Sequence, residues 1–353
     1  MSLFTVTDYD KKVYEEQLRD YLPNKIIDIH THVWKGAPKP LNPNAPKRTV
    51  TWPSLVAAEN KIEDIMEAYK LYFPDKEVTP LIFASKVRDL ETCYERNAYI
   101  SEAAKVSGYP ALYYSHPLQT ADEVEREIFR NGYLGIKSYL SLSPAYIPGK
   151  EVRILDFFPP HQLEMINRNG LMVMLHIPRD ARFRDPVNIA QIRYICETYP
   201  NIRLVIAHVG RAYCQCDVGD AFEQLKDYTD LYYDFTANTS AYVFERLLEN
   251  VSLDKIMFGS DEPIVRMRMH RIEENGTYIN LVPPGLYGDP SQDPHLREVS
   301  EEEGKKLTFF MYEEILAMKE ATTKLGLGAD VVEKLFYSNA KKLLDELQSK
   351  VRA

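Results

Sequence analysis

Short apolar runs alternate with longer amphipathic stretches along almost the whole 353-residue chain, and this alternation is the strongest constraint on the fold. Most runs are apolar throughout, as expected for strands of a parallel sheet that is buried on both faces. They predict eight strands, at residues 26–30, 79–84, 111–115, 135–139, 171–176, 203–208, 231–235 and 255–259. The amphipathic stretches predict helices between them, including 121–129, 186–199, 220–228 and 241–249.

Two architectures are built from such repeated strand–helix units, a closed (β/α)8 barrel and an open doubly wound sheet. An open sheet would normally carry a glycine-rich phosphate turn after its first strand. Here the first strand runs into His30-Thr31-His32 instead. We therefore predict an α/β fold with a single (β/α)8 TIM barrel spanning residues 1–353.

Four segments lie outside the minimal barrel. Residues 1–21 are expected to form an N-terminal helical extension, and residues 300–353 to form C-terminal helices. Ser300 to Glu303 has the form of a capping box, which predicts a helix from there to about residue 325. Long loops are predicted after the first strand, at 34–54, and after the eighth, at 262–299. Loops at the carboxyl ends of barrel strands build active sites.

Composition and charge narrow the classes of partner. The formal net charge of −9 argues against nucleic-acid binding, which usually requires a basic face. The sequence has no long apolar stretch to span a membrane and no apolar run typical of a signal peptide near its start, so we expect a cytoplasmic protein. The four cysteines lack the spacing of a disulfide framework. Cys214-x-Cys216 could be a soft metal site, although two thiols without nearby partners are more often bystanders.

Histidines gather at the ends of the predicted strands. His30 and His32 lie on one face of the first strand because side chains alternate along a strand. His176 ends the fifth strand, His208 ends the sixth, and Asp261 follows the eighth. Each residue alone is weak evidence, since a histidine at a strand end is usually structural. A closed barrel brings all of them to one mouth, where imidazoles and a carboxylate match the preferences of Zn²⁺, Mn²⁺ or Fe²⁺.

These motifs resemble those of the amidohydrolase superfamily. The order H-x-H, His, His, Asp on strands one, five, six and eight carries the resemblance. IIDIHTH, AHVGR, FGSDEP and FYSNAKKLL are similar to the amidohydrolase-related group, which contains aminocarboxymuconate-semialdehyde decarboxylase, resorcylate decarboxylases and lactonases. The resemblance covers roughly residues 25–345 and implies a barrel of the metal-dependent hydrolase type.

The resemblance implies a role for each matching residue. His30, His32 and His176 would be metal ligands, and Asp261 a ligand or proton shuttle. His208 would lie beside the metal as a second catalytic residue, polarising the substrate or orienting the attacking water. The implied cofactor is one divalent metal ion, Zn²⁺ ahead of Mn²⁺. Some branches of the superfamily carry a carbamylated lysine that bridges two metals at the position of Lys137; we expect one metal and an unmodified lysine.

Further residues are candidates for substrate binding. Lys137 and Tyr139 lie at the end of the fourth predicted strand, and Trp34, Arg179, Arg211 and Tyr213 closely follow the proposed ligands in the sequence. Arginine forks suit carboxylates, so an anionic substrate is attractive, although the arginines after the fifth strand could equally form internal Arg–Asp pairs. A packing role is at least as good an interpretation of Trp34. Asp28 is expected in a supporting layer behind the histidines. Glu262 stands where related sequences often have an aromatic residue, which leaves the substrate side open.

Three functions are compatible with this site. The first is hydrolysis of a small ester, lactone or amide by a metal-activated water. The second is nonoxidative decarboxylation of an aromatic or unsaturated acid, which can use the same ligands. The third is a metal-free lactonase or a binding barrel without turnover. The expected partner is a small molecule, and a homodimer or larger homo-oligomer is compatible with such a barrel.

Overall fold

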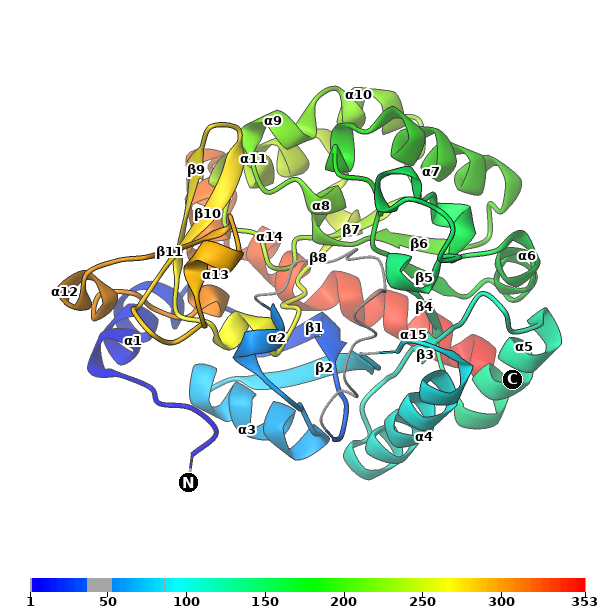
Figure 1. Cartoon of the computed structure of the whole chain (residues 1–353), viewed down its shortest axis with the longest axis horizontal. Helices are drawn as coiled ribbons and strands as arrows, with labels where there is room; N and C mark the ends of the chain where they lie inside the picture. The colour runs from blue at the N-terminus through cyan, green and yellow to red at the C-terminus, as the bar shows by residue number, and fades with distance from the viewer. Residues whose placement is uncertain (1, 37–52, 86, 353) are drawn as a thin grey trace.

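The computed structural model describes residues 2–36, 53–85 and 87–352. Eight parallel strands occupy its centre, and each overlaps a predicted strand (Figure 1). Their bounds are β1 Lys25–His32, β2 Glu77–Phe83, β3 Tyr113–Tyr114, β4 Gly135–Lys137, β5 Met172–Leu175, β6 Arg203–Ile206, β7 Tyr232–Asp234 and β8 Ile256–Met257. β1 pairs with β2, and β3 to β8 form a six-stranded sheet in chain order.

Backbone hydrogen bonds join these two sheets into a closed barrel. Between β8 and β1, the Ile29 N–H donates to the Phe258 carbonyl at 3.0 Å and the Asp261 N–H donates to the His30 carbonyl at 2.7 Å. Between β2 and β3, Ile82 forms a parallel bridge with Ala111. The predicted (β/α)8 barrel is therefore confirmed, and the carboxyl ends of β1 and β8 lie side by side.

Helices surround the strands (Figure 1). Those between strands are α2 Pro53–Val56, α3 Ile62–Tyr72, α4 Leu90–Ser107, α5 Ala121–Asn131, α6 Pro160–Asn169, α7 Pro186–Thr198, α8 His208–Arg211, α9 Gln215–Val218, α10 Ala221–Leu225 and α11 Ala241–Asn250. The C-terminal part contains α12 Glu301–Gly304, α13 Phe310–Lys324, α14 Ala329–Glu333 and α15 Asn339–Val351. α15 packs against β1 and β8. No helix in the described part of the chain is long and apolar enough to cross a membrane.

The N-terminal extension is helical, as predicted. α1 spans Asp8–Val13 and continues as a π-helical segment over Tyr14–Leu18. Thr7 caps α1 by accepting a hydrogen bond from the Asp10 N–H. Asp10 also accepts hydrogen bonds from the Arg268 guanidinium and, at 2.9 Å, from the Thr308 hydroxyl. The extension is thereby tied to the segment that follows β8.

The prediction of a loop over residues 262–299 is wrong. This insertion forms a small sheet in which β9 His270–Glu274 pairs antiparallel with β10 Thr277–Val282, and β11 Leu296–Glu298 pairs parallel with β10. Asn275 and Gly276 make the turn between β9 and β10, both with positive φ, at 53° and 72°. An Asn-Gly pair between two strands is a strong hairpin signal. In Figure 1 the sheet stands at the edge of the barrel beside α13.

The predicted helix from Ser300 to about residue 325 is interrupted. Ser300 does cap α12 with the expected capping box, but α12 ends at Gly304. The following segment pairs with the start of the insertion: the Met269 N–H donates to the Thr308 carbonyl, and the Phe310 N–H donates to the Met267 carbonyl. These long-range bonds replace helical ones, so α13 begins only at Phe310. The loop predicted at 34–54 falls largely outside the described residues.

Candidate metal centre

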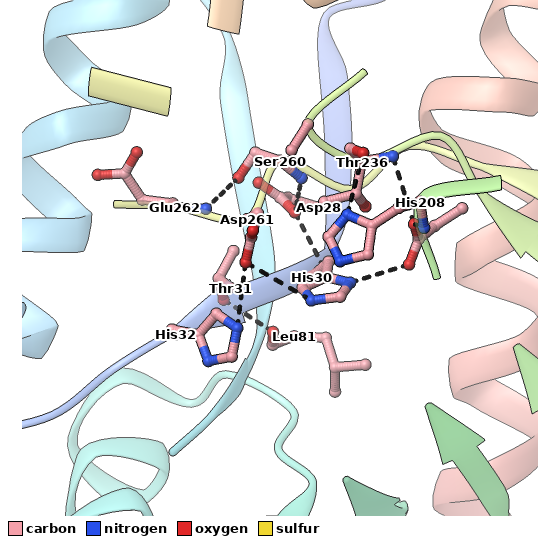
Figure 2. Close-up of polar contacts among 12 residues, drawn as sticks. Asp28, His30, Thr31, His32, Leu81, His208, Thr236, Ser260, Asp261 and Glu262 are labelled. Carbon is pink, nitrogen blue, oxygen red and sulfur yellow. Dashed lines mark hydrogen bonds and ion pairs between the residues drawn. The ribbon is translucent and has the colours of Figure 1, made fainter. Parts of the chain in front are cut away.

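Three side chains converge where β1 and β8 meet. One ligand atom from each of His30, His32 and Asp261 lies within 4.8 Å of the others. His32 Nε2 is 3.1 Å from Asp261 Oδ1, and His30 Nε2 is 3.7 Å from the same oxygen. Figure 2 shows both imidazoles turned toward the Asp261 carboxylate. The barrel thus brings together residues that lie about 230 positions apart in the sequence.

The tautomer of each of the two imidazoles is set by the hydrogen bond that its Nδ1 makes on the side of the ring away from Asp261. His30 Nδ1 lies 2.9 Å from Asp234 Oδ2, and His32 Nδ1 lies 3.0 Å from the Ala84 carbonyl oxygen. Both partners are acceptors, so each Nδ1 carries the hydrogen and each Nε2 presents a lone pair. His30 Nε2 is buried and has no hydrogen-bond partner among the described residues.

The two Nε2 lone pairs and the Asp261 carboxylate oxygen repel one another unless a cation lies between them. A divalent ion bound to two imidazoles and one carboxylate relieves this repulsion. A carboxylate behind a ligating histidine is also the usual way to orient such a ring. The residues present therefore fit a divalent metal ion.

Asp234, the last residue of β7, was not identified from the sequence. It is fully buried. Its Oδ1 accepts hydrogen bonds from the His208 N–H at 2.6 Å and the Thr236 N–H at 3.3 Å, while its Oδ2 contacts His30. Burial by itself would raise the pKa of Asp234, but the neighbouring His30 lowers it below its usual value. Its only sequence signal was one acid inside the apolar run LYYDF.

His208 lies beside the three ligand candidates on a strained turn. His208, Val209 and Arg211 have positive φ, at 57°, 48° and 58°. Such a conformation is costly for residues with side chains and is typical of functional sites. The His208 ring centroid is 4.8 Å from that of His30, and its Nδ1 lies 3.1 Å from the Thr236 carbonyl oxygen. The His208 Nε2 is therefore free of the proton.

His176 lies outside this three-residue group. Its ring centroid is 5.1 Å from that of His208 and 4.6 Å from that of Tyr139, and its buried Nδ1 has no hydrogen-bond partner among the described residues. The structure therefore gathers three of the four expected ligands and puts the fourth next to His208.

Burial and charge set the protonation of the cluster. Burial lowers the pKa of His30 to about 3, and it lowers the pKa of His176 well below the usual value for histidine. Burial alone would raise the pKa of Asp261, but the neighbouring histidines, His32 foremost, lower it to about 2. Near neutral pH these groups are neutral imidazoles and a carboxylate, which are the forms that bind metals.

Lys137, the last residue of β4, is buried and has no hydrogen-bond partner for Nζ among the described residues. Its Nζ lies 5.5 Å from the centroid of the Phe83 ring. Burial lowers the pKa of Lys137 to about 8. Burial has the opposite effect on an acid and raises the pKa of the nearby Tyr139 to about 12. The cluster is therefore bordered by a buried ammonium group that lacks a bonded partner.

The arginines after β5 are held by internal contacts. Arg179 Nε lies 3.1 Å from Asp185 Oδ1, and Arg182 Nη1 lies 2.6 Å from Asp217 Oδ2. Arg211 Nη1 lies 3.1 Å from the Pro178 carbonyl oxygen and also contacts the carbonyl oxygens on either side of it. The internal Arg–Asp pairing considered from the sequence is the arrangement observed for Arg179.

Tyr213 and Trp34 occupy different surroundings. The Tyr213 ring centroid is 6.3 Å from that of His208, so Tyr213 borders the cluster. Trp34 is buried, and its indole N–H donates to the Ala58 carbonyl at 3.0 Å. Burial and this hydrogen bond fit the packing role considered for Trp34 from the sequence.

Asp28 and Glu262 lie behind the cluster. Asp28 Oδ1 accepts hydrogen bonds from the His30 N–H at 3.0 Å and the Ser260 N–H at 2.9 Å, and its Oδ2 accepts one from the Tyr69 hydroxyl at 2.7 Å. Asp28 thus supports the backbone of the cluster, as expected. The Glu262 carboxylate points away from the histidines in Figure 2 and pairs with the Arg266 guanidinium.

Comparison with known proteins identifies the family. A family model described as amidohydrolase matches residues 27–345. The chain belongs to this family. The family predicted from the sequence motifs is therefore confirmed, and its members are enzymes. No curated protein matches the sequence significantly.

Solved structures share the amidohydrolase fold at low sequence identity. 4-Oxalomesaconate hydratase from Rhodopseudomonas palustris is 14% identical, with a TM-score of 0.56 over 93% of this chain and 98% of that chain. 2,6-Dihydroxybenzoate decarboxylase from Rhizobium is 12% identical, with a TM-score of 0.52 over 92% and 99%. 5-Carboxyvanillate decarboxylase from Novosphingobium aromaticivorans is 12% identical, with a TM-score of 0.50 over 81% of both chains, and its structure contains manganese.

Proposed function

We propose that this amidohydrolase is a metal-dependent hydrolase that acts on a small ester, lactone or amide carrying a carboxylate. His30, His32 and Asp261 would hold one divalent ion, Zn²⁺ ahead of Mn²⁺, with His176 completing the set. One observation carries the proposal: two imidazoles, each with its Nδ1 bound to an acceptor, face one carboxylate oxygen. That arrangement is the donor set of a catalytic metal site that leaves a position open.

A divalent ion in this position would supply Lewis-acid chemistry and lower the pKa of a nearby water molecule. The remaining steps belong to side chains of this chain. Asp261 is ionised at neutral pH, because its pKa is about 2, so it can accept a proton from the attacking water. Its carboxyl group then delivers that proton to the leaving group. His208, with Nε2 free, can orient the water or receive a hydrogen bond from it.

The charges around the cluster support an anionic substrate. Lys137 is a buried cation without a bonded partner, and such a group is costly unless an anion is bound near it. Tyr139 and Tyr213 border the same cluster and would contact the body of the substrate. Arg211 lies close enough to His176 to influence its pKa, and it adds positive charge on that side.

Nonoxidative decarboxylation is the second candidate. The same buried Lys137 could hold the carboxylate that is lost, and two solved decarboxylases of aromatic acids share the fold. The metal ligands would be the same, so the ligand set does not separate the two reactions.

Isotope tracing separates them. The metal-loaded protein would be incubated in H₂¹⁸O with a panel of carboxylated esters, lactones and amides and with a panel of aromatic and unsaturated acids. Hydrolysis predicts ¹⁸O in the organic product, whereas decarboxylation predicts CO₂ release and an organic product without ¹⁸O. Full turnover by chelator-treated protein would refute metal dependence and favour a metal-free lactonase.

A further inference from the structure

A cavity of about 400 Å³ opens between the insertion and helices α11 and α13. This volume is in the range of small-molecule binding sites. The lining residues come from four segments: Tyr213 and Gln215 after β6, residues 239–242 and 245 around α11, residues 271–273 of β9, and Glu320 and Lys324 of α13. The metal-ligand candidates are not among them.

Arg271 gives this cavity a cation that lacks a counter-ion. Its Nε donates to Asn280 Oδ1 at 2.8 Å and its Nη1 donates to the Ala237 carbonyl at 2.9 Å, and both acceptors are neutral. Within the described ranges, no carboxylate forms an ion pair with Arg271. A guanidinium has five N–H donors, and these contacts use two of them.

Aromatic rings surround the same guanidinium. Its central carbon lies 4.4 Å from the centroid of Tyr278, 4.6 Å from that of Phe310 and 5.2 Å from that of Tyr213. These contacts fix the plane of the side chain and partly stabilise the charge. Burial lowers the pKa of Arg271, the direction expected for a cation taken from water without an ionic partner. The guanidinium is therefore held in place, charged and able to bind an anion.

The other charges of the cavity restrict which anion fits. Lys324 Nζ is 2.6 Å from Glu245 Oε2, so its charge is already balanced. Glu273 Oε2 accepts a hydrogen bond from the Gln215 N–H at 2.9 Å. With Glu320, the lining holds three acids against two bases, and this disfavours dianions such as phosphate. Tyr213, Tyr242 and Ile272 offer flat or apolar contact surface.

We propose that this cavity binds a small aromatic monocarboxylic acid, with the carboxylate on Arg271 and the ring beside Tyr213. The proposal does not depend on the metal or on the hydrolase function. The cavity nevertheless adjoins the candidate active site, because the Tyr213 ring centroid is 6.3 Å from that of His208. The insertion would thus supply a recognition site that the barrel alone lacks.

Calorimetric titration of chelator-treated protein tests the proposal. The probes are benzoate and 2-naphthoate, with benzamide as the neutral isostere of benzoate and inorganic phosphate as the dianion. We expect at least one acid to bind, and benzamide and phosphate to bind at least about tenfold more weakly than benzoate, since a charge-assisted hydrogen bond is lost or the charge is disfavoured. Binding of neither acid, or equal binding of benzoate and benzamide, would overturn the proposal.

Variants locate the binding. Arg271→Gln should weaken the binding of the acid at least about tenfold, whereas Arg246→Gln, the matched control on α11 outside the cavity lining, should leave it unchanged. Arg271→Gln also removes hydrogen bonds within the insertion, so Ala241→Phe provides a second variant, which fills the cavity and leaves Arg271 intact. Retained affinity in Arg271→Gln and Ala241→Phe, or lost affinity in a folded His30→Ala protein, would place the acid elsewhere and refute the assignment.

Discussion

Asp234→Asn is the perturbation that most sharply separates an organised metal site from a chance cluster of histidines. Asp234 Oδ1 accepts hydrogen bonds from two backbone N–H groups, those of His208 and Thr236. An asparagine at this position keeps its oxygen there, so its NH₂ group takes the place of Oδ2 and faces His30 Nδ1. The ring must then accept at Nδ1 and carry its hydrogen on Nε2, which removes the lone pair directed at the metal position.

The expected magnitude is a 10- to 100-fold loss of metal affinity, as is typical when the group that orients a ligating histidine is changed. This corresponds to about 1.4–2.7 kcal/mol. The assay is competition for Zn²⁺ between the protein and a chromophoric chelator, with circular dichroism to confirm the fold.

Asp28→Asn is the matched control. Asp28 is an equally buried acid, but it contacts the His30 backbone N–H and leaves the ring alone. We expect Asp28→Asn to change the metal affinity little. Wild-type affinity in folded Asp234→Asn protein, or equal losses in the two variants, would refute the argument that the orientation of His30 is set by Asp234.

Three other perturbations follow from the site. Lys137→Met should raise KM for a carboxylated substrate about tenfold or more, because it removes the cation proposed to bind the carboxylate. Stability should not fall, since Lys137 is a buried cation with no bonded partner among the described residues. If Lys137→Met changed KM for the carboxylated substrate no more than KM for a neutral analogue, this would contradict the proposal. Gly259→Ala would place a Cβ against Thr236 Oγ1 and 2.7 Å from His30 Cβ, so thermal unfolding should show a loss of about 1–3 kcal/mol. Gly328→Ala, whose Cβ would meet only a flexible side chain, should be nearly neutral. In metal-free protein the pKa of His30 is about 3 in the folded state against 6.5 in the unfolded state, so the unfolded state binds more protons between these values and stability should fall as pH drops from 6.5 toward 3. This group contributes a slope of about 1.4 kcal/mol of unfolding free energy per pH unit. Urea unfolding of wild type and His30→Gln at several pH values measures it. Parallel pH profiles for the two proteins would count against this pKa for His30.

The barrel could be predicted because it depends on local patterns. Mostly apolar runs mark strands that are buried on both faces, and a predicted run overlaps each of the eight strands. The hairpin over β9 and β10 also had a local signal, the pair Asn275-Gly276, which the reading of residues 262–299 as a loop overlooked. The break before Phe310 had only the weak signal of Gly304, because it results mainly from hydrogen bonds to residues 267 and 269.

Some residues of the candidate site could likewise be predicted from the sequence, and others could not. His30 and His32 share a strand face, and Asp261 follows the neighbouring strand, so closure of the barrel alone predicts their convergence. Asp234 could not be singled out, since one acid at a strand end is usually a cap or turn residue. Arg271 reaches its cavity only because the insertion folds back onto α11 and α13, and a sequence pattern does not carry that information.

The most direct test of the metal centre is the metal content of protein purified without chelator or affinity metal, measured by plasma mass spectrometry. Wild type, His30→Ala and Asp261→Ala would be compared, each checked for folding. We predict about one Zn or Mn per wild-type chain and loss of that metal in His30→Ala. Two metals per chain would indicate a modified Lys137, and a folded wild-type protein that takes up no metal even after reconstitution would contradict the central claim.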